Sequence, residues 1–105
     1  MSDDLGFAPP PFDTGEALQK LKRELRALGL AERQGADAHE RLFERRTSPI
    51  AKARIDGEVI SAARVRKPSR SSPEWQTKAL RSSAEVRDFV ADLKKQLAQW
   101  SDRDD

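Results

Sequence analysis

The 105-residue sequence contains no cysteine, no tyrosine and only one histidine, His39. Without cysteine the chain has no disulfide, no thiolate metal ligand and no cysteine nucleophile. His39 belongs to a polar segment, where a solvated imidazole is far commoner than a catalytic or metal-binding one. No serine lies in a nucleophile elbow or beside a base. The sequence therefore predicts no catalytic residue and a protein that is not an enzyme.

Phosphate-binding loops and ordered metal ligands are also missing. The five glycines are scattered along the chain, whereas phosphate loops need them closely spaced. Carboxylates gather only near the two ends, as Asp3 with Asp4 and as Asp102 with Asp104 and Asp105. These segments are expected to be tails without fixed geometry. We therefore expect no metal site and no cofactor.

No apolar run approaches the length that a membrane-spanning helix needs, and the first residues are acidic rather than basic. The sequence therefore predicts a cytoplasmic protein without membrane binding. Residues 1–12 are expected to form a flexible tail, because three consecutive prolines favour an extended conformation. Phe7 and Phe12 beside these prolines could be a short motif for a partner, although an arm on the chain's own domain is commoner.

The segment from about Thr14 to Leu28 has the pattern of an amphipathic helix. Its leucines recur at intervals of three and four residues, which places them on one stripe. Asp13 and Glu16 have the spacing of a capping box, and Gly29 supplies a left-handed stop.

A second helix is expected from about Ser83 to Trp100, again with a capping box, formed by Ser82 and Glu85. Its apolar residues share one face and follow a heptad spacing. Both apolar stripes are expected to cover the chain's own sheet. The alternative is that they pair between two copies of the chain.

Between the helices the sequence favours strands. Asp56-Gly57 lies between two runs that contain isoleucine and valine, which is a strong hairpin signal. Residues 41–47 are weakly strand-like, with a short helix as the alternative, and residues 73–81 alternate as a strand although they could also start a helix. Residues 29–40 are expected to form a loop.

The register of the hairpin decides which side chains share a face. A two-residue turn at Asp56-Gly57 mixes polar and apolar side chains, whereas a three-residue loop from Ile55 to Gly57 separates them by placing Arg54 opposite Glu58. We favour the second register, in which the cations of both strands lie on one face. Those cations are Lys52, Arg54, Arg64 and Arg66.

These elements predict an α+β, two-layer domain with an N-terminal helix, a three- or four-stranded antiparallel meander and a C-terminal helix. The domain is expected to span residues 13–100, between the flexible tail at 1–12 and an acidic C-terminal tail at 101–105. A chain of this length fits one domain.

Positive charge is concentrated in the middle of the chain. Residues 41–81 contain eleven lysines and arginines against four acidic residues, although the net charge is only +2. Such asymmetry can form an attractive surface for nucleic acid or an acidic protein. The candidate polyanion-binding residues are Lys52, Arg54, Arg64, Arg66, Lys67, Arg70 and Trp75.

A cationic track that ends in an aromatic side chain is typical of single-stranded nucleic acid binding. Long cationic side chains also commonly cover the open face of a small sheet, and Trp75 could belong to the core. The sequence leaves both interpretations open.

Two resemblances bear on these alternatives. The order of helix, strands and helix is similar to that of double-stranded RNA-binding domains, whose second helix opens with a lysine-rich cluster that clamps phosphates. Here the matching positions are Ser82, Ser83, Ala84 and Glu85, so the resemblance implies topology alone. The segments GFAPPPF and SSAEVRDFVADLKKQLAQW resemble a family of short bacterial proteins without assigned function, which implies no activity, cofactor or catalytic residue.

The expected function is that of a small non-enzymatic binding or accessory protein that contacts nucleic acid or another polyanion through its basic central segment. The alternative is a protein-interaction or homodimerisation module that uses the apolar stripes of its helices.

Overall fold

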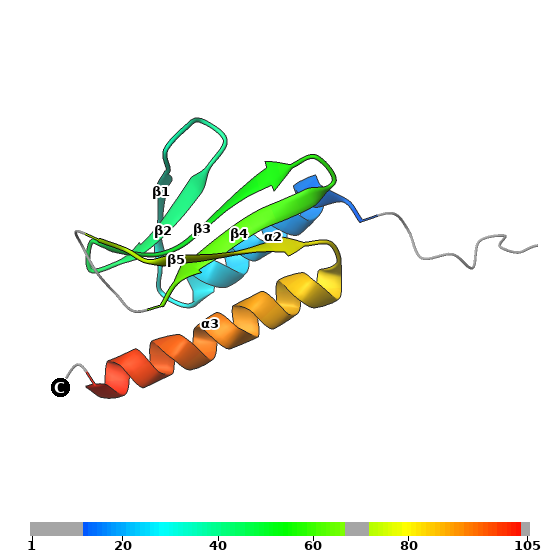
Figure 1. The fold of residues 1–105 in the computed structure, drawn as a ribbon. Helices are drawn as coiled ribbons and strands as arrows, with labels where there is room; N and C mark the ends of the chain where they lie inside the picture. The colour runs from blue at the N-terminus through cyan, green and yellow to red at the C-terminus, as the bar shows by residue number, and fades with distance from the viewer. Residues whose placement is uncertain (1–11, 67–71, 104–105) are drawn as a thin grey trace, which may run out of the picture.

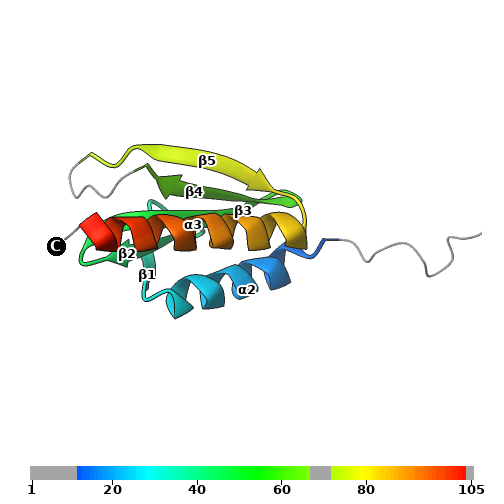
Figure 2. The ribbon, with the colours of Figure 1, turned by 90° about the horizontal axis from the view of Figure 1, so that it is seen from below.

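The computed structural model describes residues 12–66 and 72–103. In chain order the elements are helix α2 (Thr14–Ala27), strands β1 (Ala31–Gln34), β2 (Arg41–Arg45), β3 (Ser48–Asp56), β4 (Val59–Val65) and β5 (Trp75–Leu80), and helix α3 (Ser83–Arg103). The strands form one antiparallel sheet in the order β1-β2-β3-β4-β5. Both helices lie on one face of this sheet (Figures 1 and 2). The predicted α+β class is confirmed, with five strands in the meander instead of three or four.

Both helices begin where the capping signals predicted. The Asp13 carboxylate accepts a hydrogen bond from the backbone N–H of Glu16 (3.1 Å), and the Ser82 hydroxyl accepts one from that of Glu85 (3.2 Å). Each bond satisfies an N–H group that the first turn of a helix leaves without a backbone partner. After α2 the chain turns through Gly29, whose φ of +89° is readily adopted by glycine.

The apolar stripes of both helices are buried in the chain's own core. Leu21 and Leu25 of α2 and Leu93 of α3 are fully buried, and they belong to one cluster with Phe43 and Ile60 of the sheet. This packing is the arrangement that the helical periodicity favoured. The stripes are therefore used within one chain, with Leu18, Leu28 and Val90 partly buried at their borders.

Two segments differ from the prediction. Residues 29–40, expected to be a loop, contain strand β1, and α3 continues beyond Trp100 through Arg103. The first three residues of the expected acidic tail are therefore helical. Of the expected N-terminal tail, Phe12 is half-buried and packs against the core, while residues 1–11 lie outside the described residues.

The favoured register of the central hairpin is wrong. Asp56 pairs with Val59 and Arg54 pairs with Ser61, so the turn consists of Gly57 and Glu58. Gly57 has a φ of +64°, and glycine at the first central position is typical of a type II′ turn, whose twist suits a hairpin. The turn is thus shifted along the chain from both positions considered from sequence, and polar and apolar side chains mix on each face.

This register places neighbouring cations on opposite faces of the sheet. Arg64 pairs with Ala51 and therefore faces the helices, whereas Lys52 pairs with Ala63 and faces away from them. We call the second face the outer face. The sheet therefore does not carry all its central cations on one surface, as the favoured register required.

Candidate functional site

The outer face carries one close contact between a cation and an aromatic ring. Lys52 Nζ lies 4.5 Å from the centre of the Trp75 ring. The two residues come from β3 and β5, so the contact crosses over β4, where Ala63 is paired with both Lys52 and Thr77. Trp75 also packs against the core as a half-buried residue. Trp75 therefore packs against the core and also contacts a surface cation, so each of the two interpretations from the sequence describes part of its environment.

Arg54 also belongs to the outer face, but it is engaged with the loop between β1 and β2. Its Nη1 donates to the carboxylate of Asp37 at 3.0 Å. The same carboxylate accepts the backbone N–H groups of His39 (2.8 Å) and Glu40 (3.1 Å). The hydrogen bond from His39 and the positive charge of Arg54 hold the pKa of Asp37 below its ordinary value. Arg54 thus organises a loop, and His39 contributes its backbone to that loop.

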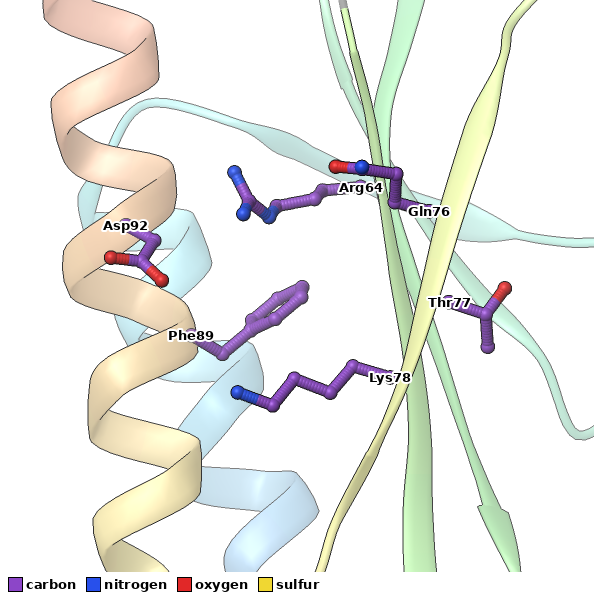
Figure 3. Close-up of a pocket in the computed structure, with 6 residues that line it drawn as sticks. All are labelled: Arg64, Gln76, Thr77, Lys78, Phe89 and Asp92. Atoms are coloured by element: carbon purple, nitrogen blue, oxygen red, sulfur yellow. The ribbon is translucent and has the colours of Figure 1, made fainter.

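Arg64 points from β4 towards the helices (Figure 3). Its Nη1 donates a hydrogen bond to Oε1 of Gln96 on α3. Half-burial and this bond give Arg64 a role in docking α3 onto the sheet. It does not join Lys52 in one continuous surface.

A pocket of about 260 Å³ lies between the sheet and α3 beside Arg64. Figure 3 shows Lys78 and Arg64 directed from the sheet towards α3, with Asp92 on the helix opposite them and Thr77 directed away. The six residues that line the pocket are Arg64, Gln76, Thr77, Lys78, Phe89 and Asp92. Because the carboxylate of Asp92 offsets part of the positive charge, the pocket offers little net attraction to an anion.

Arg66 directly follows β4 and is bonded through its backbone N–H to Glu74, just before β5. Its Nε is 3.7 Å from a carboxylate oxygen of Glu74, and the two side chains are 61% and 77% exposed. An ion pair this exposed contributes little to stability and is readily exchanged for another partner. The remaining two predicted cations, Lys67 and Arg70, lie outside the described residues.

An exposed arginine that the sequence did not single out lies in the turn between β2 and β3. Arg45 pairs with Ser48, so the turn consists of Arg46 and Thr47. Their φ angles are +53° and +68°, which is the left-handed pattern of a type I′ turn that asparagine and glycine usually adopt. A β-branched residue such as Thr47 rarely has a positive φ, which costs about 1–2 kcal/mol. The hairpin holds this strained turn in place and displays Arg46 to solvent.

Arg45, Arg46 and Arg66 lie at the same end of the sheet. The turn between β2 and β3, the end of β4 and the start of β5 all lie there (Figure 1). We call this the basic end, and define it as Arg45, Arg46 and Arg66 together with the adjoining pair of Lys52 and Trp75. Glu74 offsets one of its positive charges. No signal in the sequence marked Arg46, because the Arg-Thr turn has neither glycine nor asparagine.

A second ionic cluster joins α2 to the sheet through Glu32 of β1. The carboxylate is paired with Arg26 (2.8 Å), Arg41 (2.8 Å) and Lys22 (3.4 Å), and its side chain is 12% exposed. Burial alone raises the pKa of Glu32, but the hydrogen bond from Arg41 and the charge of Lys22 outweigh burial and lower it. Both carboxylate oxygens are occupied by these partners, so this cluster is structural.

The described part of the chain contains no group of three or more histidine, cysteine or acidic side chains placed to hold a metal ion. Within the same residues no helix combines the length and the apolar character needed to cross a membrane. Comparisons with family models, with curated proteins and with solved structures found no match for this chain.

Proposed function

We propose that this chain is a non-enzymatic binding protein that holds a polyanion, in the form of single-stranded nucleic acid, at its basic end. The observation that carries the proposal is the juxtaposition of the Lys52 and Trp75 contact with the exposed Arg46 and Arg66 at one end of the sheet. Cations bind phosphates, and an aromatic ring beside them offers a stacking surface for a base.

The backbone of the turn between β2 and β3 supports this assignment. Arg46 and Thr47 both have positive φ angles, and strain of this kind is concentrated at functional sites. A turn of asparagine and glycine would have the same twist without the strain. The chain instead has an exposed arginine at the tip.

The basic end suits a polyanion better than the pocket beside α3 does. In the pocket Asp92 faces two cations, whereas at the basic end Arg46 is exposed and the pair of Arg66 with Glu74 is long and solvated. A phosphate can therefore replace Glu74 as the partner of Arg66 at little cost. From the sequence, Lys67 and Arg70 add two more cations to the segment that joins β4 and β5.

The test is a titration of a labelled single-stranded oligonucleotide with the wild-type chain and with the double variant Arg46→Glu/Arg66→Glu, at several salt concentrations. We expect affinity to fall steeply with salt for the wild type. In the double variant we expect at least a tenfold loss of affinity. Each phosphate contact on a single strand contributes about 0.7 to the salt slope, so loss of two contacts lowers the slope by about 1.4.

The matched control is Arg23→Glu/Arg87→Glu, which changes the net charge equally at two exposed arginines of α2 and α3. The proposal requires this control to bind nearly as well as the wild type, apart from a small long-range effect of charge. Equal losses in both double variants would show that net charge, and not the basic end, causes the binding. No binding by the wild type at low salt would disprove the proposal.

A second experiment distinguishes binding of nucleic acid from binding of other polyanions. Inorganic polyphosphate has the charge of a nucleic acid backbone but no bases, so it cannot stack on Trp75. We expect Trp75→Leu to weaken oligonucleotide binding by about tenfold, since stacking contributes about 1–3 kcal/mol per base, and to leave polyphosphate binding unchanged. An equal effect on both ligands would show that Trp75 acts through the fold.

A further inference from the structure

Strand β5 forms one edge of the sheet, and its backbone hydrogen-bonding groups alternate in direction. Arg66 donates its backbone N–H to the carbonyl of Glu74, which lies opposite it (3.1 Å). Hydrogen-bonded pairs alternate along an antiparallel ladder, so Arg64 with Gln76 is also such a pair. The backbone groups that point away from β4 are therefore those of Trp75, Thr77 and Ala79.

This edge has few of the features that usually block strand pairing. Proteins protect edges with short strands, prolines, bulges or several charges. The opposite edge follows that pattern, because β1 has four residues and two of them, Glu32 and Arg33, are charged. By contrast β5 has six residues, pairs regularly with β4 and carries Lys78 as its one charge. Among the described strands none pairs with its outer edge.

We propose that β5 is a homodimerisation edge, on which β5 of a second copy pairs antiparallel with Thr77 opposite Thr77. In this register Trp75 lies opposite Ala79 of the second copy, and Gln76 lies opposite Lys78. Each residue whose backbone groups point away from β4 then lies opposite another such residue. Each of these pairs therefore exchanges both backbone hydrogen bonds. The result is a continuous sheet of two meanders.

The side chains in this register are complementary. Threonine opposite threonine is a favourable cross-strand pair, and each Lys78 lies opposite the neutral amide of Gln76 instead of a like charge. Centring the strands on Lys78 would put the two ammonium groups opposite each other. Centring them on Gln76 would put Ala79 opposite Pro73, which has no N–H to donate. The Thr77-centred register therefore aligns residues 75–79 of the two copies with the fewest conflicts.

The helices leave room for the second copy. In Figure 2, α3 crosses the helix-bearing face beside β5, and β5 forms the border of the sheet. The apolar stripes of α2 and α3 are buried within one chain, so the dimer depends on the strand and not on the helices. The two proposals share Trp75, but this inference rests on the backbone edge of β5, and its tests change only Gln76 and Thr77.

The first test is the mass of the full chain by sedimentation equilibrium over a hundredfold range of concentration. We expect a monomer–dimer equilibrium in the wild type and a monomer at every concentration for Thr77→Pro. The N–H of Thr77 points away from β4, so proline there removes an intermolecular donor and no donor of the chain's own ladder. Circular dichroism should show an unchanged fold. A monomeric wild type at the highest concentration would disprove the proposal.

The second test uses charge and does not depend on tolerance of proline. In the proposed register position 76 lies opposite Lys78 of the second copy, so Gln76→Glu is expected to tighten dimerisation about fivefold. Gln76→Lys places two pairs of like charges opposite each other and is expected to weaken it by a similar factor. The two effects should shrink with salt. Identical dimerisation of the two variants would disprove the register.

Cross-linking gives a direct measure of the register, because the natural sequence contains no cysteine. In the proposed dimer the two Cα atoms at position 77 are about 5.5 Å apart, within the range of a disulfide. Oxidised Thr77→Cys is therefore expected to form a covalent dimer much faster than oxidised Gln76→Cys. Faster cross-linking of Gln76→Cys would overturn the Thr77-centred register.

Discussion

Lys52 and Trp75 are in contact although their strands are not neighbours in the sheet. The Lys52 ammonium lies 4.5 Å from the centre of the Trp75 ring, and the strand between them places Ala63 in the same row as Lys52. Ala63 is 2% exposed even though it faces away from the helices. The bridge over β4 therefore explains why a small residue on the uncovered face is buried.

This bridge predicts a measurable coupling between the two side chains. Lys52→Met keeps most of the apolar stem and removes the charge, so we expect it to lower the free energy of unfolding by about 0.5–1 kcal/mol. In a double-mutant cycle with Trp75→Leu, measured by urea unfolding, the effect of the double variant on the free energy of unfolding should differ from the sum of the two single effects by a similar amount. Strictly additive effects would show that the contact contributes nothing to stability.

The Glu32 cluster predicts a stability that depends on pH. Glu32→Gln leaves Lys22, Arg26 and Arg41 without their shared carboxylate, so we expect a loss of about 2 kcal/mol in the free energy of unfolding at pH 7. The pKa of this carboxyl is lowered in the folded chain. Its stabilisation is therefore fully present above the unfolded-state pKa of about 4.3 and is lost as pH falls through the lower folded-state pKa.

Urea unfolding of the wild type and of Glu32→Gln from pH 7 to pH 2 measures this dependence. The two free energies should converge towards the acid end of the range, where the carboxylate is protonated. The matched control is Glu24→Gln, which alters an exposed carboxylate of α2. A constant difference between wild type and Glu32→Gln over the whole range would contradict the assignment.

The strained turn between β2 and β3 predicts that stability and oligonucleotide affinity can be changed by different substitutions. Thr47→Gly relieves a β-branched residue at a φ of +68°, so we expect it to raise the free energy of unfolding by about 1 kcal/mol. Because Arg46 is kept, oligonucleotide affinity should not change. Arg46→Gly should also tolerate the positive φ but should weaken binding several-fold. Equal binding by the two variants would remove Arg46 from the site.

The helices were predictable because their signals are local. Asp13 and Ser82 form the N-terminal hydrogen bonds that their spacing indicated, and the leucine stripes contact the core as their periodicity predicted. For β5 the alternation from Trp75 to Leu80 favoured a strand but left a helix open, and the structure has the strand. The two helix assignments needed no information from distant residues.

The features that escaped prediction depend on contacts between distant segments. The sequence of β1, AERQ, lacks residues that favour strands, and the strand is held by its pairing with β2 and by ion pairs from Glu32 and Arg33. The register of the central hairpin follows from burial of Ile60 and Ala62 in the core. This register places Arg64 on the face of the sheet that packs against the helices.

The structure separates the candidate residues of the basic segment. Of the candidate residues, Lys52 and Trp75 are in contact, whereas Arg54 and Arg64 serve a loop and a helix. Arg46 was not found, since nothing in its local sequence distinguishes a displayed turn residue from an ordinary strand residue.

The most direct test of the central claim is an NMR titration of the isotopically labelled chain with a short single-stranded oligonucleotide. We expect the largest amide and indole shift changes at Arg46, Arg66 and Trp75, and little change on the exposed face of α3. The same titration of Arg46→Glu/Arg66→Glu should give small changes. Changes centred on the pocket between Lys78 and Asp92, or no changes at low salt, would contradict the account.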